Sequence, residues 1–224
     1  MSWIYLSHKL EESTPLYNDS GNIELKKIRK ISDGDSCNCS EIVIPAHSGT
    51  HIDAPYHFDN EGKKICDYPA EFWITKKPSI IEYRSVPGNL LSLKMIKNDL
   101  LKVSPLTDIL LIKTEAESWR GDGTDNYTKK GVGIDIDLAD WIRINLDLKI
   151  LGFDFISLSS PMHREIGRLA HQTLLSPHHS GKEPVLILED LSLKDLKVEP
   201  KTILTIPLRF EDSDGAMATV LAEI

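Results

Sequence analysis

Short apolar runs rich in β-branched residues recur along the chain, and residues that favour turns separate them. Such runs are typical of strands, and they lie near residues 3–9, 41–47, 79–84, 108–113, 149–155, 184–189, 202–208 and 217–222. Because strands must pair in sheets and bury at least one face of each sheet, this recurrence constrains the fold more than any other feature. We therefore expect a sheet-rich protein.

Helical periodicity occupies three segments between these runs. In each segment apolar residues recur every three or four positions, around 93–101, 138–146 and 161–175. The third segment has a recognisable start, because Ser160 suits an N-cap and Pro161 suits the first helical position. Strands and helices do not alternate strictly near the N-terminus, which favours an α/β fold with packed mixed β-sheets and flanking helices.

The composition is that of an ordinary globular protein, with 41% hydrophobic and 27% charged residues among 224. No repeat or long linker divides the chain, so we expect one domain over residues 1–224. The net charge of -8 provides no basic surface for nucleic acid or anionic lipid. Without a signal-like N-terminus or an apolar run of ~18 residues, we expect a cytoplasmic protein whose partner is a small molecule, not nucleic acid or a membrane.

Histidines are concentrated in one short segment. Three of the eight histidines and one aspartate fall within eleven residues, as His47, His51, Asp53 and His57. On an extended segment His51 and Asp53 share a face with backbones about 7 Å apart, so both side chains can reach one metal ion. Imidazole and carboxylate ligands suit Zn, Mn or Fe(II), so this segment predicts a metal site.

His47 can join this site only if the chain bends. A straight strand would place His47 about 13 Å from His51, too far for ligand bonds near 2 Å to one ion. Gly49 lies between them and can adopt backbone angles that are closed to other residues. We therefore expect the bend at Gly49, and we expect Gly49→Val to damage metal binding without removing a ligand.

The segment His47–His57 resembles the His-x-Gly-Thr-His-x-Asp-x-Pro-x-His motif of the metal-dependent cyclase-like hydrolase family, which includes bacterial kynurenine formamidase (arylformamidase) and isatin hydrolase. Every defined position of the motif is present. The resemblance extends along most of the chain, through Ile4–His8 with Thr14-Pro15, Gly152–Ser157, Ile187–Leu191 and Ile206–Arg209.

This resemblance implies a site with two divalent metal ions per subunit, zinc or alternatively manganese. His47, His51 and Asp53 would hold one ion, and Asp53 would bridge to a second ion held by His171 and Glu189. The implied reaction is hydrolysis of an amide, formamide, lactam or ester bond in a small, aryl-type substrate, with metal-activated water as nucleophile. The resemblance also implies a homodimer or higher homo-oligomer.

The resemblance gives two further residues a role. His57 would be the catalytic acid/base group that moves a proton between water and the leaving amine. Tyr17 follows Thr14-Pro15 where relatives tend to carry tryptophan, and it would contact an aryl substrate.

The sequence offers more than one distal histidine. Residues 176–183 look like an insertion between His171 and Glu189, so His163, His178 and His179 are alternatives to His171. If this insertion spoils the second site, the chain would be a non-catalytic metal-binding homologue.

An oxidoreductase is the other alternative. His51, Asp53 and His171 also satisfy the two-histidine, one-carboxylate triad of a non-haem Fe(II) oxygenase on a double-stranded β-helix. That interpretation leaves His47, His57 and Glu189 without a role. The predicted late helices also count against it.

Overall fold

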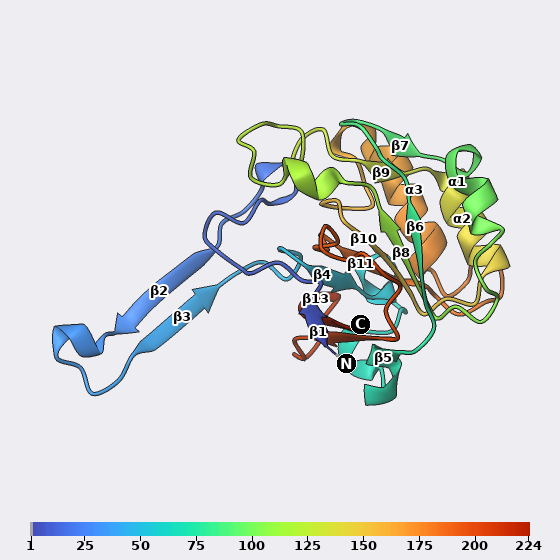
Figure 1. Cartoon of the computed structure of the whole chain (residues 1–224). Coiled ribbons are helices and arrows are strands. Elements are labelled where there is room, and N and C mark those ends of the chain that lie inside the picture. The colour runs from blue at the N-terminus through green and yellow to red at the C-terminus, as the bar shows by residue number, and fades with distance from the viewer. Residues whose placement is uncertain (1) are drawn as a thin grey trace.

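A mixed sheet of nine strands forms the centre of the fold, in the order β5-β12-β13-β4-β11-β10-β8-β6 with β1 paired to β13 (Figure 1). The computed structural model describes residues 2–224. The strands of this sheet are β1 (Trp3–Tyr5), β4 (His51–Asp53), β5 (Ile74–Thr75), β6 (Pro78–Glu82), β8 (Ile109–Lys113), β10 (Ile150–Phe153), β11 (Leu186–Glu189), β12 (Thr202–Pro207) and β13 (Gly215–Glu223). The predicted α/β class is confirmed.

One half of the sheet is parallel. Strands β6, β8, β10 and β11 run in the same direction, and β8, β10 and β11 are buried along almost their whole length. Both faces of these strands are covered, which explains why they are continuous apolar runs without polar alternation. Strand β4 joins this half antiparallel to β11, in a register that places His51 opposite Glu189.

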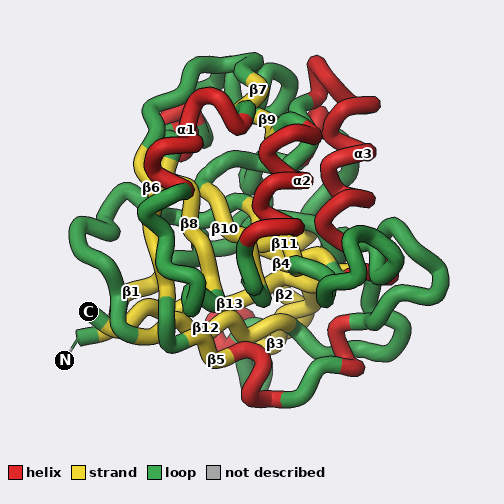
Figure 2. Tube along the Cα trace, turned by 90° about the vertical axis from the view of Figure 1, so that its right-hand side faces the viewer, coloured by secondary structure: helices red, strands yellow, loops and turns green. Residues whose placement is uncertain are grey.

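Three α-helices cover one face of the sheet: α1 (Leu93–Leu100), α2 (Ile136–Asn145) and α3 (Arg164–Leu175) (Figure 2). Ile96, Leu138 and Leu174 pack from these helices into one apolar cluster with the sheet. A second cluster lies on the opposite face, where β12 and β13 contribute Ile203 and Val220. The parallel strands are thus enclosed between two apolar layers.

The third helix begins later than predicted. Residues Pro161–His163 form a 3-10 turn, and α3 follows directly at Arg164. Ser160 nevertheless acts as the expected cap, because its hydroxyl accepts a hydrogen bond from the backbone N–H of Met162.

A separate antiparallel ribbon of β2 (Glu24–Arg29) and β3 (Cys39–Val43) projects from the body (Figure 1). We call residues 24–43 the arm. Every residue of β3 is exposed, and the strand predicted at 41–47 is shifted because the chain leaves the ribbon after Val43. A short parallel pair, β7 (Leu90–Leu91) with β9 (Gly133–Ile134), completes the strands.

Each of the predicted strands overlaps a strand of the structure. Within the described residues, every helix falls short of the length and apolar character that a membrane crossing requires.

Candidate metal centre

Strand β4 and the bend before it build half of the site. His51 and Asp53 project from β4 toward a cavity, whereas Ile52 between them is buried in the apolar cluster of the opposite face. Gly49 has a φ of +59°, so the predicted bend is present. The bend returns His47 to the strand, where its Nδ1 lies 2.8 Å from Asp53 Oδ1.

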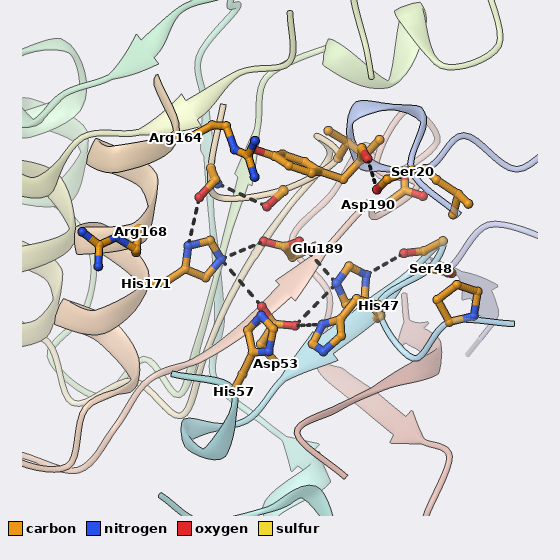
Figure 3. Close-up of a pocket in the computed structure, with 18 of the residues that line it drawn as sticks. Ser20, His47, Ser48, Asp53, His57, Arg164, Arg168, His171, Glu189 and Asp190 are labelled. Atoms are coloured by element: carbon orange, nitrogen blue, oxygen red, sulfur yellow. Dashed lines mark hydrogen bonds and ion pairs between the residues drawn. The ribbon is translucent and has the colours of Figure 1, made fainter. Parts of the chain in front are cut away.

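Strand β11 and helix α3 supply the other half. His51 Nε2 lies 3.4 Å from Asp53 Oδ1 and 3.3 Å from Glu189 Oε2. His171 Nε2 lies 3.7 Å from Asp53 Oδ2 and 3.5 Å from Glu189 Oε1. The two imidazoles thus face different oxygens of the same two carboxylates. Figure 3 shows the His171 ring turned toward Asp53 and Glu189.

The structure separates His171 from the alternative distal histidines. His178 is largely exposed and lies near Glu61, and the Nε2 of His179 pairs with Asp140. His163 sits at the start of α3, outside the donor cluster. The insertion at 176–183 therefore leaves the cluster intact.

Backbone carbonyls orient the two buried imidazoles. The Nδ1–H of His51 donates to the Gly49 carbonyl at 2.8 Å, and the Nδ1–H of His171 donates to the Gly167 carbonyl at 2.8 Å. In both rings Nε2 is then the atom that faces the carboxylates. Because a neutral Nε2 and a carboxylate oxygen are both acceptors, each contact needs a cation between the two atoms, either a proton or a metal ion.

The charges of the cluster depend on one another. Burial lowers the pKa of His51 and His171, but the Asp53 and Glu189 carboxylates outweigh it and raise the pKa of both rings. Burial likewise raises the pKa of Asp53, and the neighbouring histidines reverse the shift and hold the pKa below its usual range. A divalent ion that displaced the imidazole protons would meet two ionised carboxylates, and this donor set fits Zn, Mn or Fe(II).

Asp214 is a site residue that the sequence analysis missed. Its Oδ2 lies 2.8 Å from His47 Nε2 and 3.0 Å from His57 Nδ1. Burial lowers the pKa of His47, but Asp53 and Asp214 raise it to about 10. The pKa of His57 is lowered, first by burial and then by the charge of His47.

The residue beside Asp214 is a glycine that lies directly against the His47 ring. A Cβ on Gly215 would lie 2.4 Å from the His47 ring, so the close approach of β13 to His47 excludes a side chain. The Asp214-Gly215 pair, just before a predicted strand, was the one sequence feature that could have pointed to Asp214. It was not enough to predict a site residue, because nothing in the sequence places residue 214 beside residue 47.

The cluster opens into a cavity of about 670 Å³. Tyr17, predicted to contact substrate, lies in the cavity wall with Ile156, Phe58 and Arg164. Burial raises the pKa of Tyr17, and the nearby Arg164 guanidinium opposes that rise. Phe58 stacks on the His171 ring with centroids 4.8 Å apart, so one wall is apolar.

At the cavity wall, a buried ion pair fixes the end of β11. Asp190 follows Glu189 with a φ of +51°, and the guanidinium of Arg120 donates to both of its oxygens. Tyr127 donates its hydroxyl to the same carboxylate. Glu189 Oε1 accepts the backbone N–H of Leu158, so a backbone donor fixes the orientation of this carboxylate.

Comparison with known proteins supports the resemblance seen in the motif. Residues 4–160 match the family model described as "Putative cyclase". The kynurenine formamidase of Geobacillus thermodenitrificans (strain NG80-2) is 27% identical over 214 residues, covering 96% of this chain and 93% of the relative. Cyclase-like protein 3 of Arabidopsis thaliana is 26% identical, covering 94% and 75%.

Solved structures show the same fold. An isatin hydrolase bound to the product analogue thioisatinate superposes with a TM-score of 0.80 at 20% identity, over 98% of this chain and 91% of the other. A potential metal-dependent hydrolase with cyclase activity gives 0.74 at 21% identity, over 99% and 96%. The helix-covered, partly parallel sheet differs from the double-stranded β-helix that the oxygenase alternative requires, so that alternative is wrong.

Proposed function

The chain belongs to the "Putative cyclase" family, and from this premise we propose that it hydrolyses an amide, formamide, lactam or ester bond of a small substrate with the help of divalent metal. The relatives named kynurenine formamidase and isatin hydrolase agree with this class of reaction. One observation carries the proposal: two buried imidazoles, each oriented by a backbone carbonyl, direct Nε2 at two buried carboxylates. Such an arrangement is built for a cation.

The proposed metal site holds two ions, zinc or alternatively manganese. His47, His51 and Asp53 would bind the first ion, and Asp53, His171 and Glu189 the second. In support, Asp53 Oδ1 lies beside His47 and His51, whereas Oδ2 lies on the His171 side. The groups of three donors whose ligand atoms lie within 4.8 Å of one another divide the residues differently, as His47, Asp53 and His57 and as His51, Asp53 and Glu189, but Asp53 is common to both.

Bound divalent ions would polarise the substrate carbonyl and lower the pKa of water to about 7. The residues of the chain would supply the proton transfers. His57 is neutral near pH 7, because its pKa lies below the ordinary value. Its Nδ1–H donates to Asp214, which leaves Nε2 to accept a proton from water and return it to the leaving group.

A substrate screen without oxygen tests the reaction class. Protein loaded with zinc or manganese should bind two equivalents of metal per chain and should hydrolyse members of a panel of formamides, lactams and esters. His171→Ala should retain about one equivalent and lose turnover. One equivalent in the unmodified protein, with no turnover across the panel, would instead identify a non-catalytic metal-binding homologue.

The role of His57 has its own test, because His47, Asp53 and His57 could also hold an ion. His57→Ala should keep the metal content and lower kcat by roughly 10²- to 10⁴-fold, the range typical of a lost acid/base group. Full turnover with unchanged metal would refute the acid/base role. Loss of metal would make His57 a ligand.

We also propose that the chain acts as a homodimer or higher homo-oligomer. The arm supports this, because a two-stranded ribbon alone is marginally stable in water. Ile28, Ile31 and Ile42 are each more than half exposed on it. A second copy that covered the arm would bury these side chains.

A further inference from the structure

Arg164 is the charged residue of the cavity wall whose role the proposed reaction leaves open. The other charges there are compensated: Asp190 pairs with Arg120, and Arg168 pairs with Glu165 at 2.8 Å. Asp53 and Glu189 face imidazoles and the proposed metal. Within residues 2–224, Arg164 lines the cavity and takes part in no ion pair.

Arg164 lies on the same face of α3 as His171, one of the proposed metal ligands. It is the first residue of α3, seven residues before His171, and seven residues are about two turns, so both side chains leave the same helix face. Figure 3 shows its guanidinium turned toward the space above Glu189, whereas the guanidinium of Arg168 points away from the donors. The Tyr17 side chain lies next to this guanidinium.

The electrostatic surroundings of the Arg164 guanidinium favour binding of an anion. The chain has a net charge of -8, so its surface as a whole repels anions, and an exposed cation at the rim of the cavity that forms no ion pair is a local exception. The start of α3 adds the positive end of a helix dipole. A planar guanidinium fork matches the two oxygens of a carboxylate.

We propose that Arg164 binds a carboxylate of the substrate, so that the enzyme selects amides, formamides or lactams that carry an acidic group beside the scissile bond. This specificity rests on the proposed hydrolase function. Arg164 would hold the acid at the mouth of the cavity while the carbonyl carbon lies over the metal donors. Tyr17 would form the wall between the two.

Equilibrium binding tests the inference without requiring turnover. The probes are 2-aminobenzoate and its neutral analogue 2-aminobenzamide, both fluorescent, titrated into zinc-loaded protein. We expect tighter binding of the carboxylate, and Arg164→Gln should reduce the benzoate-to-benzamide affinity ratio by about tenfold or more, as expected for a lost charge-assisted hydrogen bond. Arg164→Lys should restore part of the ratio. Arg168→Gln, on the same helix, should keep it.

The outcomes separate the two proposals. If Arg164→Gln leaves the ratio unchanged at equal metal content, the metal or another group holds the carboxylate and the inference is wrong. An equal loss in Arg168→Gln would mean general electrostatics and would also overturn it. Hydrolysis of 3-formamidobenzoate and 3-formamidobenzamide gives the second measurement: failure to cleave any substrate refutes the hydrolase, while the binding ratio still decides the role of Arg164.

Discussion

At the scale of single residues, Asp214 makes the sharpest prediction. Its carboxylate accepts from His47 and His57 through one oxygen, and an asparagine would remove the negative charge that both rings face. Partners that orient metal ligands typically contribute 10- to 100-fold to affinity or activity. We therefore expect Asp214→Asn to lower kcat/KM by about that factor.

The same substitution should move the acidic limb of the pH–rate profile. Burial lowers the pKa of His57, and Asp214 opposes that shift, so removal of the carboxylate lowers the pKa further. Neutral His57 then persists to lower pH, and activity should be lost at a lower pH than in the unmodified enzyme. Asp212→Asn, at an exposed position that pairs with Lys64, is the control. An unchanged limb with unchanged rate would remove Asp214 from the mechanism.

The sequence predicted residues whose roles depend on near neighbours. His47, Gly49, His51 and Asp53 lie within seven positions, so strand geometry and glycine conformation were enough to bring them together. Asp214 contacts His57 across 157 positions, and no local pattern encodes that contact. His171 was predictable only in part. The sequence indicated the helix that carries it, but it did not indicate that this helix turns His171 toward Asp53 and Glu189.

At the scale of elements, the position of α3 determines whether His171 reaches the other donors. Gly167 lies one helical turn earlier, and a Cβ there would lie 2.1 Å from Ser159 Oγ and 2.5 Å from Ser159 Cα. Gly167→Ala should push α3 away from this loop. The intrinsic gain in helix propensity, about 1 kcal/mol, is smaller than the upper range of overpacking costs of about 1–3 kcal/mol.

We expect Gly167→Ala to lower the free energy of unfolding and to empty the metal position that depends on His171. Leu169→Ala, at an exposed site on the same helix, should keep both. Urea unfolding and metal analysis of the two variants provide the measurements. A stable Gly167→Ala protein with two metal equivalents would show that the loop yields and the helix stays.

The strands also show which elements the sequence could predict and which it could not. Runs such as 109–112 and 150–153 were predictable because burial on both faces makes them continuously apolar. Strand β2 escaped prediction because all six of its residues are exposed or half-buried, which removes the pressure for apolar alternation. Strand β4 was not among the predicted strands, because three residues are too short for a periodic signal; the spacing of His51 and Asp53 indicated only a strand or an extended loop.

At the scale of the whole molecule, the arm requires an explanation that one chain does not supply. Its strands pair only with each other within the described residues, and Ile28 and Ile42 are 53% and 58% exposed. A homodimer would bury these side chains, each contributing about 1.5–3 kcal/mol if covered completely. The combined variant Ile28→Ser, Ile42→Ser should therefore shift the protein from dimer to monomer.

Light scattering after size exclusion, across a range of micromolar concentrations, measures this shift. Leu101→Ser is the matched control, because Leu101 is 64% exposed on the body, away from the arm. If the arm holds the dimer, only the arm variant should dissociate, and its metal content should be unchanged because both proposed ion sites are built within one chain. An unmodified protein that is monomeric at every concentration would refute the oligomer, and a dimer that survives the arm variant would place the interface elsewhere.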